Sequence, residues 1–152
     1  MRQGIHNKNV NEDKYFLLIF SMSFQKKKLG ARGEKIATSY LQNRGYRILE
    51  CNYRNRLGEI DIIAKQGKDL VFIEVKTRSD TLFGSPFDSV TAAKQKQLSK
   101  VALEYLSRKD CLDHPARFDV VGVQLKEMKA TQWQDARIEL VQNAFDLSFG
   151  ND

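Results

Sequence analysis

Hydrophobic residues recur along this chain at two different spacings, and these spacings predict where helices and strands lie. Over 29–43 the apolar positions fall three or four residues apart on one stripe, which is typical of an amphipathic helix, and Gly45 provides a stop. A second helix is expected over 90–106 on the same grounds. Shorter runs rich in β-branched and aromatic residues predict strands at 46–53, 60–64, 70–77, 117–125 and 137–145.

The order helix, three strands, helix, two strands predicts an α/β fold with a mixed central β-sheet flanked by helices. At 152 residues the chain is long enough for one domain, which we assign to residues 22–152. Residues 1–21 combine a polar stretch with an apolar run of six, too short to cross a bilayer. We expect them to be an appended, poorly ordered segment before a domain that could begin at Met22.

The composition is that of an ordinary globular protein, because 41% of residues are hydrophobic and 29% are charged. The net charge of +6 is unevenly spread: residues 22–56 carry nine basic and two acidic side chains, whereas 110–152 carry four and eight. This pattern favours an anionic partner, although a solvated helix face produces it too. Two cysteines without a CxxC motif and two isolated histidines argue against a zinc site, a disulfide scaffold and a His-based triad, and favour a cytoplasmic location.

The strands expected at 60–64 and 70–77 are joined by KQGKD, which predicts a β-hairpin. A turn at 67–68 sets Ile62 against Ile73 and Ile60 against Val75. One face of the hairpin is then wholly apolar.

The other face of this hairpin sets Asp61 against Glu74, and Glu59 against Lys76. Two unit charges about 5 Å apart repel by roughly 3 kcal/mol at an effective dielectric of 20, so something is expected to offset the paired carboxylates. A divalent cation held between them, Mg²⁺ or Mn²⁺, would do so. A shared proton or a neighbouring cationic side chain would serve equally.

Lys76 lies two residues beyond Glu74 on the same face, where its ammonium could meet a phosphate or polarise a water. Two acids and a lysine around a metal suit attack of metal-activated water on a phosphodiester. Glu34 on the first helix and Lys94 at the start of the second could flank the same place. Each of these side chains could also be an ordinary surface charge.

Six short strings occur in the chain in a specific order: GARGEKIA, GEIDIIA, VFIEVKTRS, FGSPFDSV, RFDVV and NAF. Together, over about residues 28–147, they resemble the YraN-like family of predicted endonucleases, which is similar to archaeal Holliday-junction resolvases. The resemblance implies a restriction-endonuclease-like or resolvase-like nuclease core. It further implies that Asp61, Glu74 and Glu34 bind metal and that Lys76 positions the water or steadies the scissile phosphate. Glu59 and Lys94 are implied as an accessory acid and a phosphate contact.

Further cations are candidates for contacts with a nucleic-acid backbone. Lysines act as point charges and lack the bidentate base recognition of arginine, so sequence specificity is not implied. The candidates are Lys26, Lys27 and Lys28 before the first helix, Arg54 and Arg56 before GEID, Arg78 after the Glu-x-Lys strand, and Lys94.

These features predict a cytoplasmic, metal-dependent endonuclease that hydrolyses DNA phosphodiester bonds, with branched DNA as the substrate that the resemblance suggests. A symmetric cut in a junction needs two sites, which favours a homodimer. No membrane partner is expected. Two other functions fit the same sequence: a nucleic-acid-binding module that keeps the fold without cutting, and a scaffold whose basic half docks an acidic protein.

Overall fold

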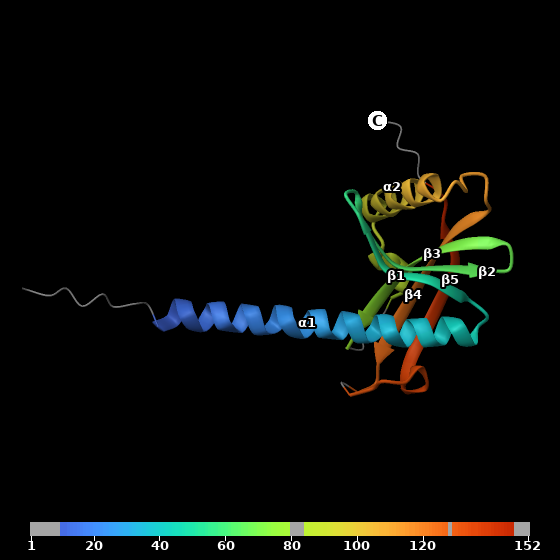
Figure 1. Ribbon diagram of the computed structural model, residues 1–152. Coiled ribbons are helices and arrows are strands. Elements are labelled where there is room, and N and C mark those ends of the chain that lie inside the picture. Colours follow the sequence, from blue (N-terminus) through green and yellow to red (C-terminus); the bar gives the residue numbers. More distant parts are fainter. Residues whose placement is uncertain (1–9, 80–83, 128, 148–152) are drawn as a thin grey trace, which may run out of the picture.

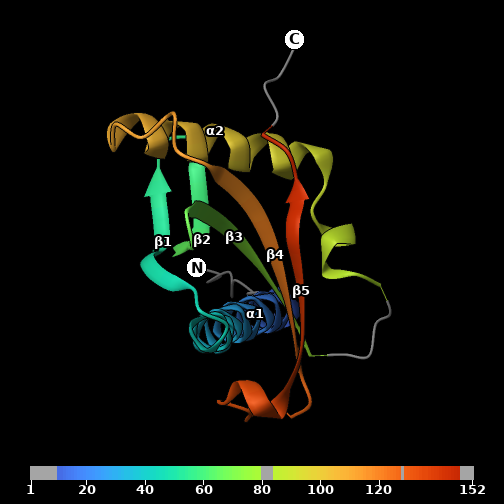
Figure 2. The same cartoon turned by 90° about the vertical axis from the view of Figure 1, so that its right-hand side faces the viewer.

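A five-stranded mixed β-sheet with two long helices packed against it forms the centre of the protein (Figures 1 and 2). The computed structural model describes residues 10–79, 84–127 and 129–147. Its helices and strands are α1 Val10–Asn43, β1 Arg47–Asn55, β2 Gly58–Gln66, β3 Asp69–Arg78, α2 Ala92–Arg108, β4 Ala116–Leu125 and β5 Ala136–Phe145, with short 3₁₀ turns η1 Pro86–Ser89 and η2 Trp133–Asp135. This arrangement confirms the predicted α/β class and is compatible with a nuclease-like core.

The strands lie in the order β1-β2-β3-β4-β5, so the sheet follows the sequence. Neighbouring strands are antiparallel except β3 and β4, which are parallel and are connected through α2. A parallel pair needs such a crossover because its two strands cannot be joined by a tight turn. Within the described residues, no helix is long and apolar enough to cross a membrane.

The two helices cover opposite faces of the sheet, and each face has its own hydrophobic cluster. Alternate residues of a strand point to opposite faces, so β3 contributes to both clusters. On the α1 side, Ile36, Ala37 and Leu41 pack against Ile62, Ala64, Val71, Ile73, Val121 and Val123. On the α2 side, Leu98, Val101, Ala102, Tyr105 and Leu106 pack against Ile60, Ile63, Leu70, Phe72, Phe118 and Val120.

Helix α1 is longer than the sequence pattern predicts. The expected helix starts at Leu29, whereas α1 starts at Val10, so residues 10–21 of the segment expected to be poorly ordered are helical and residues 1–9 lie outside the described part. Segment 10–28 contains no Gly or Pro, and the acidic residues Glu12 and Asp13 suit the first turn of a helix. This part extends clear of the sheet (Figure 1), and its apolar side chains between 15 and 24 are 52–71% exposed. Gly45, with φ 84°, follows the end of the helix as predicted.

Helix α1 crosses β3 at very close range through a glycine. A Cβ atom added at Gly33 would overlap the side chain of Thr77. A glycine is therefore required at this position, because any side chain would push the helix away from the strand. The close crossing fixes the height above the sheet of the next residue in the helix, Glu34.

Gly33→Ala is expected to destabilise the protein by about 1–3 kcal/mol, because the added methyl group overlaps Thr77. Gly30→Ala is a matched control on the same helix, where a Cβ meets nothing within 4 Å. The control should stabilise by roughly 0.5–1 kcal/mol through its higher helix propensity. Urea denaturation of both variants measures the difference, and equal shifts of the same sign would show that the crossing is not tight.

Candidate functional site

Strands β2 and β3 separate at Asp61, and this fork begins the candidate site. The predicted hairpin register is confirmed up to the pair Ile62 and Ile73, where the ladder ends. Beyond it, Asp61 Oδ2 accepts a hydrogen bond of 2.7 Å from the backbone N–H of Val75. The predicted pair Ile60 and Val75 is therefore wrong, and so is the wholly apolar face, since Ile60 packs on the α2 side while Ile62 packs on the α1 side. The side chains of β2 change faces of the sheet at Asp61, because the Asp61 carboxylate accepts the hydrogen bond that a backbone carbonyl of β2 would otherwise accept.

Glu74 lies on β3 next to this fork and is almost buried, with 6% of its surface exposed. Because side chains alternate along a strand, Glu74 lies on the same face of the sheet as Phe72, which packs under α2. Lys94, in the first turn of α2, lies next to Glu74. Glu74 Oε1 is 3.1 Å from Lys76 Nζ and 3.5 Å from Lys94 Nζ. Glu74 Oε2 is also buried and has no hydrogen-bond partner. Two ammonium groups thus neutralise one oxygen of this carboxylate and leave the other unsatisfied.

Two carboxyl groups at the fork, those of Asp61 and Glu34, have a raised pKa. Burial, and after it the negative charge of Glu74, raises the pKa of Asp61 to about 7. The hydrogen bond from Val75 and the charge of Lys94 oppose this shift. Burial also raises the pKa of Glu34, against a hydrogen bond from Asn52, and the charge of Glu74 adds to that effect. Glu34, Asp61 and Glu74 are therefore close enough to interact, although they come from α1, β2 and β3.

The donor set fits a hard divalent cation held by a small number of protein oxygens. Over the described part of the chain, no group of three or more His, Cys, Asp or Glu side chains is arranged to hold a metal ion. Mg²⁺, however, usually keeps several waters and binds proteins through one or two carboxylates. The unsatisfied Oε2 of Glu74 and the adjacent Asp61 carboxylate meet that requirement. A cation there would also remove the repulsion that raises the pKa of Asp61.

Arg54 and Glu59 border the site, whereas Arg56 faces elsewhere. Arg54 Nε forms an ion pair of 2.7 Å with Glu59 Oε2; the Arg54 side chain is largely exposed and that of Glu59 is partly exposed. Both also lie near enough to Glu34 to affect its pKa. Arg56 instead lies near Glu104 on α2, whose pKa is lowered by a hydrogen bond from Tyr53 and, to a smaller extent, by the charge of Arg56.

The remaining predicted phosphate contacts lie away from the paired acids. Arg78 ends β3, and its guanidinium donates a hydrogen bond to the Ser89 hydroxyl of η1. Lys26, Lys27 and Lys28 are exposed on α1, about 10 Å before Glu34 along the helix axis. Of the predicted residues, the structure brings together Glu34, Asp61, Glu74, Lys76 and Lys94, with Arg54 and Glu59 beside them.

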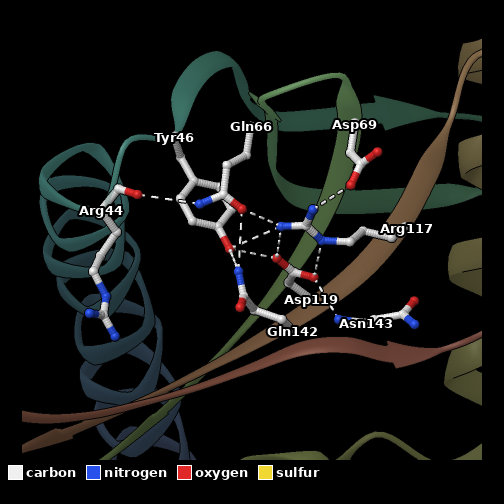
Figure 3. A network of polar contacts seen from close by, with 8 residues as sticks. All are labelled: Arg44, Tyr46, Gln66, Asp69, Arg117, Asp119, Gln142 and Asn143. Carbon is white, nitrogen blue, oxygen red and sulfur yellow. Dashed lines mark hydrogen bonds and ion pairs between the residues drawn. The ribbon is translucent and has the colours of Figure 1, made fainter.

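A second polar cluster, which the sequence analysis missed, closes the opposite end of β2 and β3 (Figure 3). Its centre is Asp119 on β4, which is completely buried and accepts four hydrogen bonds. The donors are the Tyr46 hydroxyl at 2.8 Å, the Arg117 Nε and Nη2 atoms at 3.0 and 3.1 Å, and the Asn143 backbone N–H at 2.9 Å.

The guanidinium of Arg117 extends this cluster to the β2–β3 hairpin. It donates to Asp69 at 2.7 Å and to the side-chain oxygen of Gln66 (Figure 3). The available signal was the alternation Arg-x-Asp in RFDVV, which puts both side chains on one face of an otherwise apolar strand. Because the Asp119 carboxylate has hydrogen-bond donors on both oxygens, we assign this cluster a structural role in holding the strands together.

The fold and the paired acids define a mixed α/β domain with a charged site at a strand fork, and sequence comparison identifies its family. The model of the family described as "Uncharacterised protein family UPF0102" matches residues 33–123, the span that holds all five clustered residues. The chain belongs to this family, which is the YraN-like family that its motifs indicate.

Several relatives carry the name UPF0102 protein. One from Geobacter metallireducens is 45% identical over 128 residues, which is 84% of this chain and 100% of the relative. One from Syntrophus aciditrophicus is 47% identical over 133 residues, 88% of this chain and 99% of the relative. One from Alkaliphilus oremlandii is 50% identical over 121 residues, 78% of this chain and 98% of the relative.

Asp61→Asn is expected to change how stability depends on pH in the absence of metal. Folding raises the pKa of Asp61 from its ordinary 3.8 to about 7, so between these values the folded protein binds a proton that the unfolded chain has released. Wild-type stability should therefore fall as pH rises through this window. Relative to Asp61→Asn, we expect a fall on the order of 2 kcal/mol between pH 5 and pH 8. Urea denaturation in EDTA measures it, and parallel pH profiles would contradict the buried, repelled state of Asp61.

Asp119→Ala is expected to destabilise the protein by about 3–5 kcal/mol, because it leaves Arg117 and the Tyr46 hydroxyl without their buried acceptor. Asp69→Ala is the matched control, since Asp69 pairs with the same guanidinium but its side chain is 30% exposed. That control should cost roughly 1 kcal/mol or less. Denaturant midpoints compare the two variants, and similar losses would refute the structural role assigned to Asp119.

Proposed function

We propose that this protein is a metal-dependent endonuclease that hydrolyses phosphodiester bonds in DNA, with Mg²⁺ or Mn²⁺ as the working ion. The observation that carries the proposal is the meeting of Asp61 with the buried Glu74, whose Oε2 has no partner, beside the ammonium of Lys76. A buried carboxylate oxygen without a partner is costly, so the presence of Glu74 Oε2 at a strand fork calls for a ligand. The DNA substrate is supported by the resemblance to junction resolvases and by the net charge of +6.

Each side chain of the site has a distinct role under this proposal. Asp61 and Glu74 hold the cation, and Glu34 adds a carboxylate that ligates it directly or through water. A bound Mg²⁺ supplies an activated water and stabilises the charge that develops on the phosphate. Lys76 has an ammonium 3.1 Å from Glu74, where it can bind a phosphate oxygen or orient the attacking water. Lys94 contributes a second positive charge from the start of α2.

The wider surface supports an extended polyanion as partner. Arg54 borders the acids, and Lys26, Lys27 and Lys28 continue the positive charge along α1. Such contacts supply affinity without sequence specificity. We propose branched DNA as the preferred substrate, a homodimer that provides the two sites needed for a symmetric cut, and the cytoplasm as the location, which suits two free cysteines.

Cleavage assays on the full chain test this proposal. We expect cutting of branched DNA in Mg²⁺ or Mn²⁺ and none in EDTA. Asp61→Asn, Glu74→Gln and Lys76→Met should each reduce the rate at least about a hundredfold, since each removes a group at the reacting centre. The exposed positions Glu127→Gln and Lys100→Met are controls of the same chemical types and should cut normally. DNA binding without cutting across linear and branched substrates and both ions would contradict the proposal and support the non-catalytic binding module.

A further inference from the structure

The N-terminal half of α1 presents a large apolar surface to solvent. Residues 10–28 extend clear of the sheet (Figure 1), and the eight large apolar side chains between Tyr15 and Phe24 are 52–71% exposed. Monomeric soluble proteins seldom expose so many neighbouring apolar side chains, and patches of this kind mark contacts with another protein or with a membrane. The charges that border the patch distinguish between these two partners.

One line of side chains along this half of the helix has opposite charges at its two ends. Residues seven apart lie close to one line of an α-helix, so Asp13, Phe20 and Lys27 point to the same side. Phe16 and Phe24 lie near this line, one turn before and one turn after Phe20. Asp13 and Lys27 are exposed. The line therefore starts with an acid, continues with three phenylalanines and ends with a base.

A second copy of the helix that runs in the opposite direction matches this line. With the two Phe20 side chains level, Asp13 of each copy meets Lys27 of the other, and Phe16 of each copy lies level with Phe24 of the other. One two-fold axis relates both ion pairs, as in the isologous interface of a symmetric dimer. A parallel pair would instead set Asp13 against Asp13 and Lys27 against Lys27, which repel. The charges therefore favour the antiparallel arrangement.

The same line faces away from the sheet, so a second helix has room to lie along it. Leu29 packs on the hydrophobic cluster between α1 and the sheet. Nine residues separate Leu29 from Phe20, which is half a turn at about 100° per residue. The sheet lies at the C-terminal end of α1 (Figure 1), so an antiparallel pair sends the two sheets to opposite ends of the contact.

A membrane surface fits these residues less well than a second copy does. Helices that lie on a membrane carry lysine and arginine on the polar face and sink the other face among the lipids. Here Asp13 lies in line with the phenylalanines, and Glu12 lies next to it. The lysines at 26–28 suit either partner, whereas the acids at the other end of the patch suit only a partner that brings positive charge.

We propose that residues 13–27 of α1 form the surface through which two copies of this chain dimerise, as an antiparallel helix pair centred on Phe20. The inference rests on the proposed function for the homodimer alone, to which it assigns a surface. The contact is about 21 Å long, since each helical residue adds 1.5 Å. An interface between two such short helices is small, so we expect a dissociation constant on the order of micromolar.

Sedimentation equilibrium of the full chain tests this surface by charge reversal. Asp13→Lys sets a lysine against Lys27 twice, and Lys27→Asp sets an aspartate against Asp13 twice, so each variant should raise the dimer Kd about tenfold. An equimolar mixture of the two variants should recover the wild-type Kd, because every lysine then meets an aspartate of the other chain. Lys26→Asp is the matched control: Lys26 points about 100° further round the helix than Lys27, and its Kd should stay near that of wild type.

A change at the centre of the pair tests the apolar part of the contact. Phe20→Glu puts two carboxylates at the two-fold axis and should raise the Kd at least about thirtyfold. Leu18→Glu is its control, because Leu18 points to nearly the opposite side of the helix, and it should dimerise like wild type. Both side chains are more than half exposed, so neither change disturbs the packed core.

The outcomes separate this inference from the proposed function. A wild-type chain that stays monomeric at about 100 µM, well above the expected Kd, would overturn the inference and leave the proposed endonuclease standing. Equal Kd values for Lys27→Asp and Lys26→Asp would do the same. Wild-type monomers that bind vesicles of phosphatidylcholine and phosphatidylserine would also overturn it and assign the patch to a membrane. A chain that dimerises as expected but cuts no DNA would overturn the proposed function and leave the helix pair.

Discussion

The separation of β2 from β3 at Asp61 is the constraint on which the rest of the site depends. A carboxylate there accepts the N–H of Val75 at 2.7 Å, so the ladder ends and the two strands part. The parting lets β2 turn over and sends Ile60 to the α2 side of the sheet. It also leaves the Asp61 carboxylate close to that of Glu74, just beyond the last paired residues of the two strands. An acid at this position thus shapes the backbone, and under the proposed function it also provides a metal ligand.

The two ends of the central strands use buried acids in opposite ways. Asp119 also accepts a backbone N–H, from Asn143, but Arg117 and Tyr46 complete its set of partners. Glu74 has ammonium groups on one oxygen only, and its other oxygen has no partner. A satisfied buried network gives rigidity, whereas an unsatisfied buried oxygen costs stability. The Asp119 cluster therefore stabilises the fold, whereas the unsatisfied oxygen of Glu74 is the feature that the proposed metal binding would explain.

The elements and the central register could be predicted from the sequence, because both follow from local patterns. Alternation and helical periodicity placed the strands and α2 within a few residues, and the Gly67 turn fixed the pair Ile62 and Ile73. The same turn brought Asp61 and Glu74 to neighbouring positions. Alternation fails beyond that point, because it assumes an unbroken ladder and cannot anticipate a side chain that replaces a backbone partner.

Other features were missed for equally physical reasons. The N-terminal half of α1 has no amphipathic stripe, so helical periodicity could not reveal it. The role of Arg117 depends on Tyr46 and Gln66, which are far away in the chain. Sequence patterns report the periodicity of an element, whereas these contacts depend on where elements cross.

A crystal soaked in Mn²⁺ and measured for anomalous scattering tests the central claim most directly, namely that the fork exists to hold a cation. The account predicts a manganese peak at about 2.1 Å from an oxygen of both Asp61 and Glu74. A map without a peak at the fork, in which Lys76 and Lys94 keep their places on Glu74 as its only partners, would contradict it.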